Sequence, residues 1–248
     1  MAPETPREAR RLFGKVKRAA GRLRRTAVVI CPPAVFLPLF KPGPNLALGG
    51  QDIFEAARGA YTGSISAAQI KYAGAEYTII GHSERRARGE TDELINRKIK
   101  LAGKIGLRTI LAVGETERDE RGDYLRTLRE MLERDLDRVS RAAVEALIIV
   151  YEPAWAIGGA ADAADTPENF LEHSLFIRKV LAARFGQNSA MLVPILYGGS
   201  VTPENAADFL GRGEAAGLLV GHESLSADRF STILRLADRS LTYGSGQK

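Results

Sequence analysis

The feature that most constrains the fold of this chain is a regular alternation of short apolar segments with longer amphipathic ones. The apolar segments lack the alternating pattern of half-exposed strands, so they are typical of parallel strands buried on both faces. Amphipathic crossovers between them predict a parallel sheet with helical connections. The expected strands are Ala27–Cys31, Leu46–Gly50, Tyr77–Ile80, Thr109–Val113, Ala146–Tyr151, Pro194–Tyr197 and Gly217–Val220.

Helical patterns fill the intervals between these strands. Two of them begin with Thr-Pro-Glu, at Thr166 and Thr202, which places a capping hydroxyl before a proline in the first turn. The expected helices are Pro6–Arg24, Ser66–Tyr72, Asp92–Ile105, Asp123–Ser140, Thr166–Phe185, Thr202–Leu210 and Asp228–Asp238. Neither a linker nor a change in composition interrupts the pattern, so residues 1–248 are expected to form one α/β domain.

Seven strands are compatible with two architectures. One is an open, doubly wound sheet, and the other is a (β/α)8 barrel that lacks one strand. The length of 248 residues matches a single barrel of about 250 residues. At this stage the strand pattern alone leaves both open.

Composition and charge limit the possible partners. No apolar stretch approaches the roughly 20 residues of a membrane span, so no membrane partner is expected. The single cysteine, Cys31, cannot form an internal disulfide, which favours a cytoplasmic protein. The net charge is +5, and nine basic side chains fall within the first 25 residues. A basic helix could contact nucleic acid, but such a charge run is more often a solvated face, so no nucleic-acid partner is expected.

Polar residues and glycines gather directly after the expected strands. His82 follows the strand Tyr77–Ile80 after one glycine, and Glu152 directly follows Ala146–Tyr151. The carboxyl ends of parallel strands hold the active site in barrels and open sheets alike. Glu152 could therefore be a base aimed at a substrate, or it could be a solvated charge that ends a strand.

The histidines differ in their sequence context. His82 stands between a strand and a helix, for which Ser83 is the expected N-cap. The amino end of a helix disfavours a protonated imidazole, so a functional His82 would be a neutral hydrogen-bond donor to a substrate oxygen. A structural role is the alternative for this residue. His173 falls inside a long helical pattern and is expected on the surface.

Two late loops suit a phosphate group. Gly198, Gly199 and Ser200 follow one strand, and Gly221 and His222 follow the next. Glycine-rich loops and helix amino ends bind phosphate through backbone N–H groups, and barrels do so after strands 7 and 8. Each loop alone is a weak signal, since paired glycines also form plain turns.

Several motifs together resemble the triosephosphate isomerase family, in the order and spacing of that family. They are "GAYTGSIS", "YTIIGHSERR", "GETDELINRKIKLA", "VYEPAWAIG", "LYGGSVTPENAADFL" and "GLLVGHESL". The resemblance covers essentially the whole chain. It implies a TIM (β/α)8 barrel that interconverts dihydroxyacetone phosphate and glyceraldehyde 3-phosphate through an enediolate, in glycolysis and gluconeogenesis. It implies no metal and no organic cofactor.

The same resemblance implies a role for each site residue. Glu152 looks like the base that moves a proton between two substrate carbons, and His82 like the neutral electrophile that polarises the carbonyl. Residues Pro153 to about Ala163 resemble a lid over the substrate. The substrate phosphate would bind to N–H groups of Gly158, Ser200, Gly221 and His222. The loop Gly59–Gly63 resembles the family's interface loop, with Thr62 at its tip, and implies a homodimer.

Departures from the family pattern leave the substrate open. His222 stands where a glycine is usual, with Glu223 in place of alanine, and the lid reads "AIGGAADAAD" where a Gly-Thr-Gly tip is common. Ala112 and Ser64 also differ from the usual cysteine and glutamate. A related tetrulose-phosphate isomerase acting on a four-carbon ketose phosphate is one alternative. A non-catalytic family member that serves as a binding protein is the other.

One family motif is not found. The family begins with a strand that ends in Asn-x-Lys-Met, and its lysine is a third catalytic residue. No Asn-x-Lys ends a strand before Ala27, and Lys15 and Lys17 lie within the first helical pattern. We therefore expect that strand 1 is missing, so that seven strands remain, and that Met1 lies within a longer reading frame. The chain as given is then expected to be inactive, with Glu84 deprived of its lysine partner.

Overall fold

The computed structural model describes residues 3–118, 122–156 and 165–240. Gly158 and most of the expected lid lie outside these ranges. Among the described residues, no helix has both the length and the apolar character needed to cross a membrane.

Six strands form one parallel sheet whose spatial order follows the chain. They are β1 Val28–Ile30, β2 Leu46–Gly50, β3 Tyr77–Ile80, β4 Arg108–Val113, β5 Ile148–Tyr151 and β6 Ile195–Tyr197. The seventh expected strand, Gly217–Val220, is present only as a parallel bridge between Leu218 and Tyr197, which places it beside β6. Among the described residues, β1 pairs only with β2, so the sheet is not closed between β1 and this segment.

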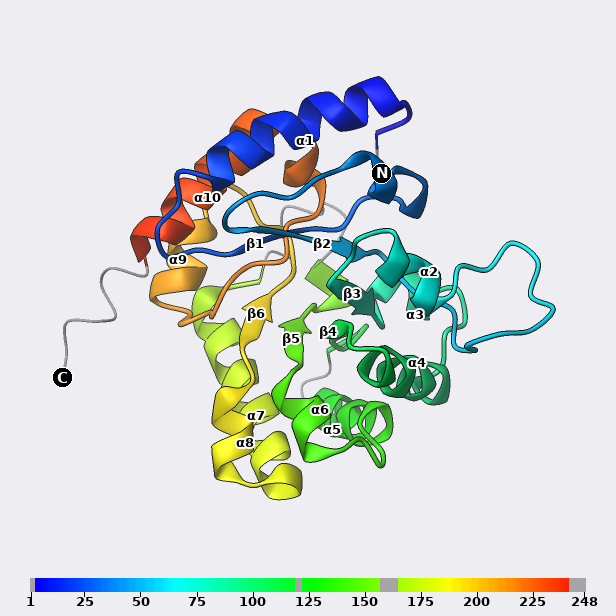
Figure 1. The fold of residues 1–248 in the computed structure, drawn as a ribbon. Coiled ribbons are helices and arrows are strands. Elements are labelled where there is room, and N and C mark those ends of the chain that lie inside the picture. The colour runs from blue at the N-terminus through cyan, green and yellow to red at the C-terminus, as the bar shows by residue number, and fades with distance from the viewer. Residues whose placement is uncertain (1–2, 119–121, 157–164, 241–248) are drawn as a thin grey trace.

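Helices surround the sheet (Figure 1). The α-helices are α1 Pro6–Ala20, α2 Ala67–Tyr72, α3 Ser83–Arg86, α4 Asp92–Lys104, α5 Asp123–Asp135, α6 Arg141–Glu145, α7 Pro167–Phe185, α8 Gln187–Leu192, α9 Ala206–Gly211 and α10 Ala227–Ser240. The part of the chain that the structure describes also contains the 3-10 helices η1 Ala34–Leu39, η2 Ala154–Ala156 and η4 His222–Leu225. Although α1 and α10 come from opposite ends of the chain, they lie side by side.

The expected helix starts are right at α2 and α7, where Ser66 and Thr166 accept hydrogen bonds from the third helical N–H. The expected start at Thr202 is wrong, because α9 begins at Ala206. There Thr202 accepts from the N–H of Glu204, and its own N–H donates to Asn205 Oδ1. Side chain and backbone thus form a local turn, which competes with a helix.

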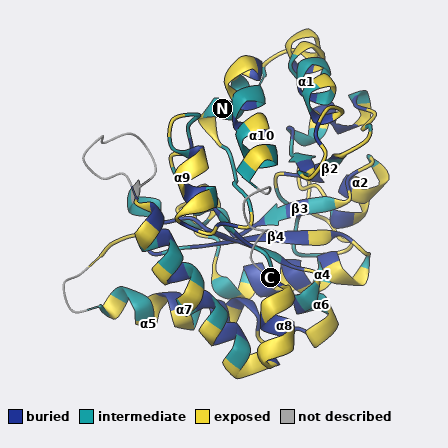
Figure 2. Cartoon of the chain, turned by 90° about the vertical axis from the view of Figure 1, so that its left-hand side faces the viewer, coloured by how far each residue is buried: buried dark blue, intermediate teal, exposed yellow. Residues whose placement is uncertain are grey.

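Burial follows the periodicity of each element. Strand β4 is buried from Thr109 to Val113, whereas helix α1 buries only Ala9, Phe13, Val16 and Ala20 at helical spacing. Figure 2 shows this as dark blue strands inside helices whose outer faces are exposed. The layered core brings the carboxyl ends of neighbouring strands to one edge, since Val113 pairs with Tyr151 and Tyr151 with Tyr197.

Candidate active site

Glu152 and His82 meet at this carboxyl edge. Glu152 directly follows β5, and His82 follows β3 after Gly81. The backbone N–H of Glu152 donates to Val113 O at 2.8 Å, so β4 fixes the position from which the carboxylate projects. Nε2 of His82 lies 3.0 Å from Oε1 of Glu152. The two candidate catalytic side chains are therefore in direct contact.

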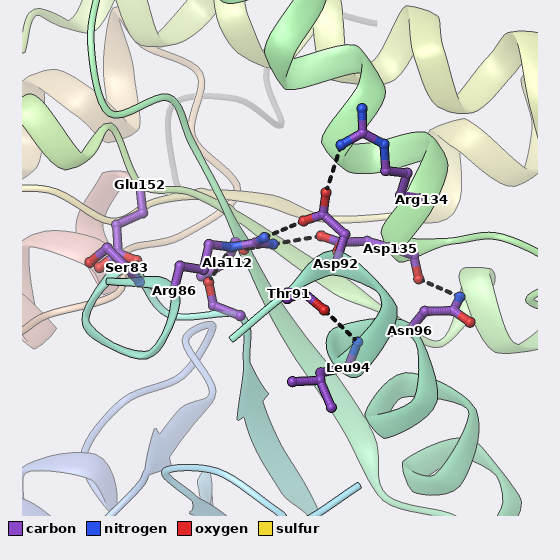
Figure 3. A network of polar contacts seen from close by, with 11 residues as sticks. Ser83, Arg86, Thr91, Asp92, Leu94, Asn96, Ala112, Arg134, Asp135 and Glu152 are labelled. Atoms are coloured by element: carbon purple, nitrogen blue, oxygen red, sulfur yellow. Dashed lines mark hydrogen bonds and ion pairs between the residues drawn. The ribbon is translucent and has the colours of Figure 1, made fainter. Parts of the chain in front are cut away.

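The carboxylate of Glu152 is buried and held by two donors. The residue is only 5% exposed. The backbone N–H of Ser83 donates to Oε2 at 3.0 Å, and the His82 ring occupies Oε1. Figure 3 shows Glu152 beside Ser83. Both oxygens of this buried carboxylate therefore have a hydrogen-bonding partner, which fixes its orientation.

His82, and not Ser83 as expected, is the N-cap of α3. Its Nδ1 accepts the backbone N–H of Glu84 at 3.3 Å. An acceptor Nδ1 and a donor Nε2 describe a neutral ring. The hydrogen bond to Glu152 raises the pKa of His82 above its usual value, although burial opposes that change. If the Glu152 side chain rotates away from His82, it no longer raises the pKa of the imidazole. The N–H of Glu84 still donates to Nδ1 and continues to oppose protonation of that nitrogen.

Arg86 braces the turn that carries His82. Its Nε donates to the carbonyl oxygen of Gly81 at 2.9 Å. One terminal nitrogen lies 2.6 Å from the carboxylate of Asp92, and the other lies 2.6 Å from the carboxylate of Asp135 (Figure 3). Burial raises the pKa of Asp135 to about 7. The sequence analysis missed this network, although Arg86 belongs to the "GHSERR" motif.

Two glycines allow the backbone to approach closely here. A Cβ on Gly114 would lie 2.1 Å from the carbonyl oxygen of Glu152. Gly81 has φ +76°, a left-handed conformation that favours glycine. Both glycines are therefore required by the geometry of the His82–Glu152 pair.

A second carboxylate near this pair is that of Glu115, which the sequence did not indicate as a site residue. It is 1% exposed. Its Oε1 accepts from the hydroxyl of Tyr151 at 2.8 Å and from Nε1 of Trp155 at 2.9 Å. The signal in the sequence was its place, two residues after an expected strand. These bonds hold the residues on both sides of Glu152.

The expected surface position of His173 is wrong. The residue is fully buried on α7, where its Nδ1 lies 2.7 Å from Asn169 O. Its ring stacks on Tyr151 with centroids 4.8 Å apart. The face of α7 that carries His173 packs towards the sheet. The sequence of α7 is only weakly amphipathic, so it does not predict which face is buried.

The candidate phosphate residues follow β6 and the neighbouring segment. Ser200 follows β6, and its carbonyl oxygen accepts from Asn205 Nδ2 at 2.8 Å. Gly221 is the N-cap of η4, and the exposed His222 is the first residue of that helix. These three residues follow strand ends on the same edge as Glu152. The fourth candidate, Gly158, lies outside the described residues.

Comparisons with known proteins agree with this arrangement. The family model described as triosephosphate isomerase matches residues 2–237. A triosephosphate isomerase of Carboxydothermus hydrogenoformans is 42% identical over 241 residues, and one of Thermus thermophilus is 41% identical over 239 residues; each alignment covers 94% of both chains. The crystal structure of triosephosphate isomerase from Bartonella henselae superposes with a TM-score of 0.80 at 36% identity, covering 91% of this chain and 92% of that one. The barrel class expected from the sequence is confirmed.

Proposed function

The chain belongs to the triosephosphate isomerase family, and we propose that Glu152 is the base of the family's reaction and His82 the group that polarises the substrate carbonyl. The reaction interconverts dihydroxyacetone phosphate and glyceraldehyde 3-phosphate, a step of glycolysis and gluconeogenesis, so the substrate is a small phosphorylated sugar. The observation that carries the assignment of residues is the 3.0 Å contact between His82 Nε2 and Glu152 Oε1.

The contact indicates how the two residues would divide the chemistry. Glu152 turns from His82 and Ser83 towards a carbon-bound proton of the substrate and removes it, which leaves an enediolate. The same carboxylic acid returns the proton to the neighbouring carbon. The Nε2–H of His82, released from Glu152, donates to the carbonyl oxygen and passes its proton to it. The same nitrogen then takes the hydroxyl proton from the oxygen on the other carbon, so the carbonyl and hydroxyl groups exchange carbons. A positioned acid or base of this kind contributes a factor of about 10² to 10⁴ in rate.

The substrate phosphate is assigned to the other half of the edge. We propose that backbone N–H groups of Ser200, Gly221 and His222 bind it, with Gly158 as a further donor. Backbone donors at turns and helix starts suit an anion, and they are independent of side-chain identity. Gly221 at the N-cap of η4 supports this assignment.

Assembly and location are further parts of the proposal. Residues 1–248 would form one domain, and two copies would associate through the loop Gly59–Gly63 with Thr62 at its tip. In support, Tyr61 within the loop is 50% exposed and Ile65 beside it is 40% exposed, so the loop offers apolar surface that a partner could cover. A cytoplasmic location fits a sugar-phosphate substrate. The basic outer face of α1 is assigned to solvent rather than to nucleic acid.

One assay tests the function against both alternatives. The purified chain is given dihydroxyacetone phosphate or a four-carbon ketose phosphate, with the Glu152→Gln variant as the control, and circular dichroism verifies folding of both proteins. Because residues 1–248 lack a first strand that ends in Asn-x-Lys, we expect turnover of the triose phosphate when such a strand is added before Met1, and we expect the variant to lose that turnover. Faster turnover of the four-carbon substrate would support the tetrulose-phosphate alternative. A folded protein that carries the added strand and still converts neither substrate would support the non-catalytic alternative.

A further inference from the structure

Arg118 lies after β4, and its guanidinium contacts the surroundings of Glu152 on several sides. Nε donates to Glu115 Oε1 at 3.1 Å, and one terminal nitrogen donates to the Tyr151 hydroxyl at 3.1 Å. The other terminal nitrogen donates to Asn169 Oδ1 on α7 at 2.8 Å. Its Cζ lies 4.4 Å from the centre of the Trp155 ring. One side chain thus joins β4, β5, η2 and α7.

Glu115 needs a cation at this place. It is almost fully buried, and its Oε2 has no hydrogen-bond partner among the described residues. A buried carboxylate is strongly unfavourable unless it is paired. Arg118 is its ion-pair partner, at 3.1 Å, with a side chain that is 29% exposed. The other donors to Oε1, the Tyr151 hydroxyl and the Trp155 indole, are neutral. Arg118 is therefore the charged donor among the described partners of this oxygen.

Glu115 and Arg118 hold the chain on both sides of the proposed base. Tyr151 directly precedes Glu152, and Trp155 follows it by three residues. The backbone N–H of Ala154 also donates to Glu115 O at 3.0 Å. A shift of Trp155 or Tyr151 would therefore be passed to the backbone of Glu152.

The stacking contacts favour arginine over lysine at this position. The guanidinium lies over the Trp155 ring and also 5.2 Å from the centre of the Tyr124 ring. A planar guanidinium stacks on aromatic rings and offers donors in fixed directions, while an ammonium does neither. Lysine would keep the charge near Glu115 but lose the fixed geometry.

We propose that Arg118 is a positioning residue for the base: it pairs with Glu115 and holds Trp155 and Tyr151, and through them it sets the place of Glu152. This inference rests on the proposed function of Glu152. Arg118 does not itself contact the His82–Glu152 pair in the described contacts, so its effect on the reaction is indirect.

The test compares Arg118→Gln and Arg118→Lys with the control Arg126→Gln. Arg126 is an arginine on α5 whose side chain is 71% exposed. Trp155 is the only tryptophan, so its fluorescence reports the contact directly and needs no activity.

We expect Arg118→Gln to shift Trp155 emission to longer wavelength and to increase its quenching by acrylamide. We expect kcat to fall about tenfold with little change in KM, since the base is displaced by less than the ~1 Å that costs ~10²-fold. Arg118→Lys should lie between wild type and Arg118→Gln, and Arg126→Gln should match wild type.

The outcomes separate this inference from the proposed function. Trp155 fluorescence unchanged in both Arg118 variants would overturn the inference. Altered fluorescence with unchanged kcat in an active enzyme would also overturn it, because the contact would then be structural only. If the wild type remains inactive after a strand ending in Asn-x-Lys is added before Met1, the proposed function fails, while the fluorescence still decides whether Arg118 holds Trp155. If Arg118→Gln does not fold, Arg118→Lys supplies the same two measurements.

Discussion

The two halves of the carboxyl edge are built differently. At the ends of β3 to β5, the proposed functional atoms belong to side chains, and the buried Glu115 and the half-buried Arg86 hold them in place. At the end of β6 and beyond it, the candidate donors are backbone N–H groups in glycine-rich turns, and His222 is exposed. We call these the side-chain half and the backbone half of the site.

The difference teaches where substitutions are tolerated. A side-chain atom used in catalysis requires its own residue type and also the neighbours that fix its rotamer. A backbone N–H is supplied by any residue except proline. This explains how His222 and Glu223 can replace the usual small residues without removing a phosphate donor, whereas Glu152 and His82 match the family pattern.

The largest expected effect tests the side-chain half directly. Glu152→Asp withdraws the carboxylate by one methylene, and a misplacement of ~1 Å can cost ~10²-fold in rate. We expect kcat to fall by about that factor while the melting curve stays close to wild type, because the residue lies beyond the end of β5. An unchanged kcat would remove Glu152 from its role and with it the basis of the comparison.

A smaller effect is expected from a glycine that contacts the base. Gly114→Ala would place a Cβ 2.1 Å from Glu152 O, so the backbone of Glu152 has to move. We expect kcat to fall by about tenfold or more. Gly211→Ala is a matched control, since a Cβ there meets nothing within 4 Å. Equal kcat values for both variants would show that the position of Glu152 is not fixed by close packing.

The sequence predicted six of the seven expected strands, because a buried apolar segment is a local signal, and it placed the proposed catalytic residues Glu152 and His82 just after two of them. The sequence does not predict the ion-pair partners of Arg86. Asp135 lies 49 residues away in sequence, and only the packing of α5 brings it close. His82 was assigned the wrong cap role for a different reason: a histidine Nδ1 can accept an N–H as a serine hydroxyl does. The burial of His173 likewise depends on contact with Tyr151.

A third prediction concerns the stability of the side-chain half. Because burial raises the pKa of Asp135 from 3.8 to about 7, the folded state holds this proton more tightly than the unfolded state. The resulting stabilisation is complete below pH 3.8 and is lost as pH rises towards 7. Asp135→Asn should abolish this slope, which is at most about 1.4 kcal/mol per pH unit.

The measurement is urea unfolding of wild type and Asp135→Asn between pH 4 and 8. Asp137→Asn is the control, because its carboxylate is 57% exposed. A difference between wild type and Asp135→Asn that does not change with pH would mean that the Arg86 guanidinium keeps Asp135 ionised throughout. The brace of the side-chain half would then be a permanent ion pair.

The smallest effect is expected in the backbone half. His222→Gly retains the N–H that we assign to the phosphate and removes only an exposed imidazole. KM for the triose phosphate should therefore fall or change by less than about threefold, with kcat unchanged.

A sulfate ion in crystals of both forms should lie against Ser200, Gly221 and residue 222. A KM that rises tenfold or more would show that the imidazole itself contacts the substrate, because removing a charged or neutral donor from a phosphate costs about that much. In that case both halves of the edge would use side chains to contact the substrate. His222 would then be one of the side chains by which this protein selects its substrate.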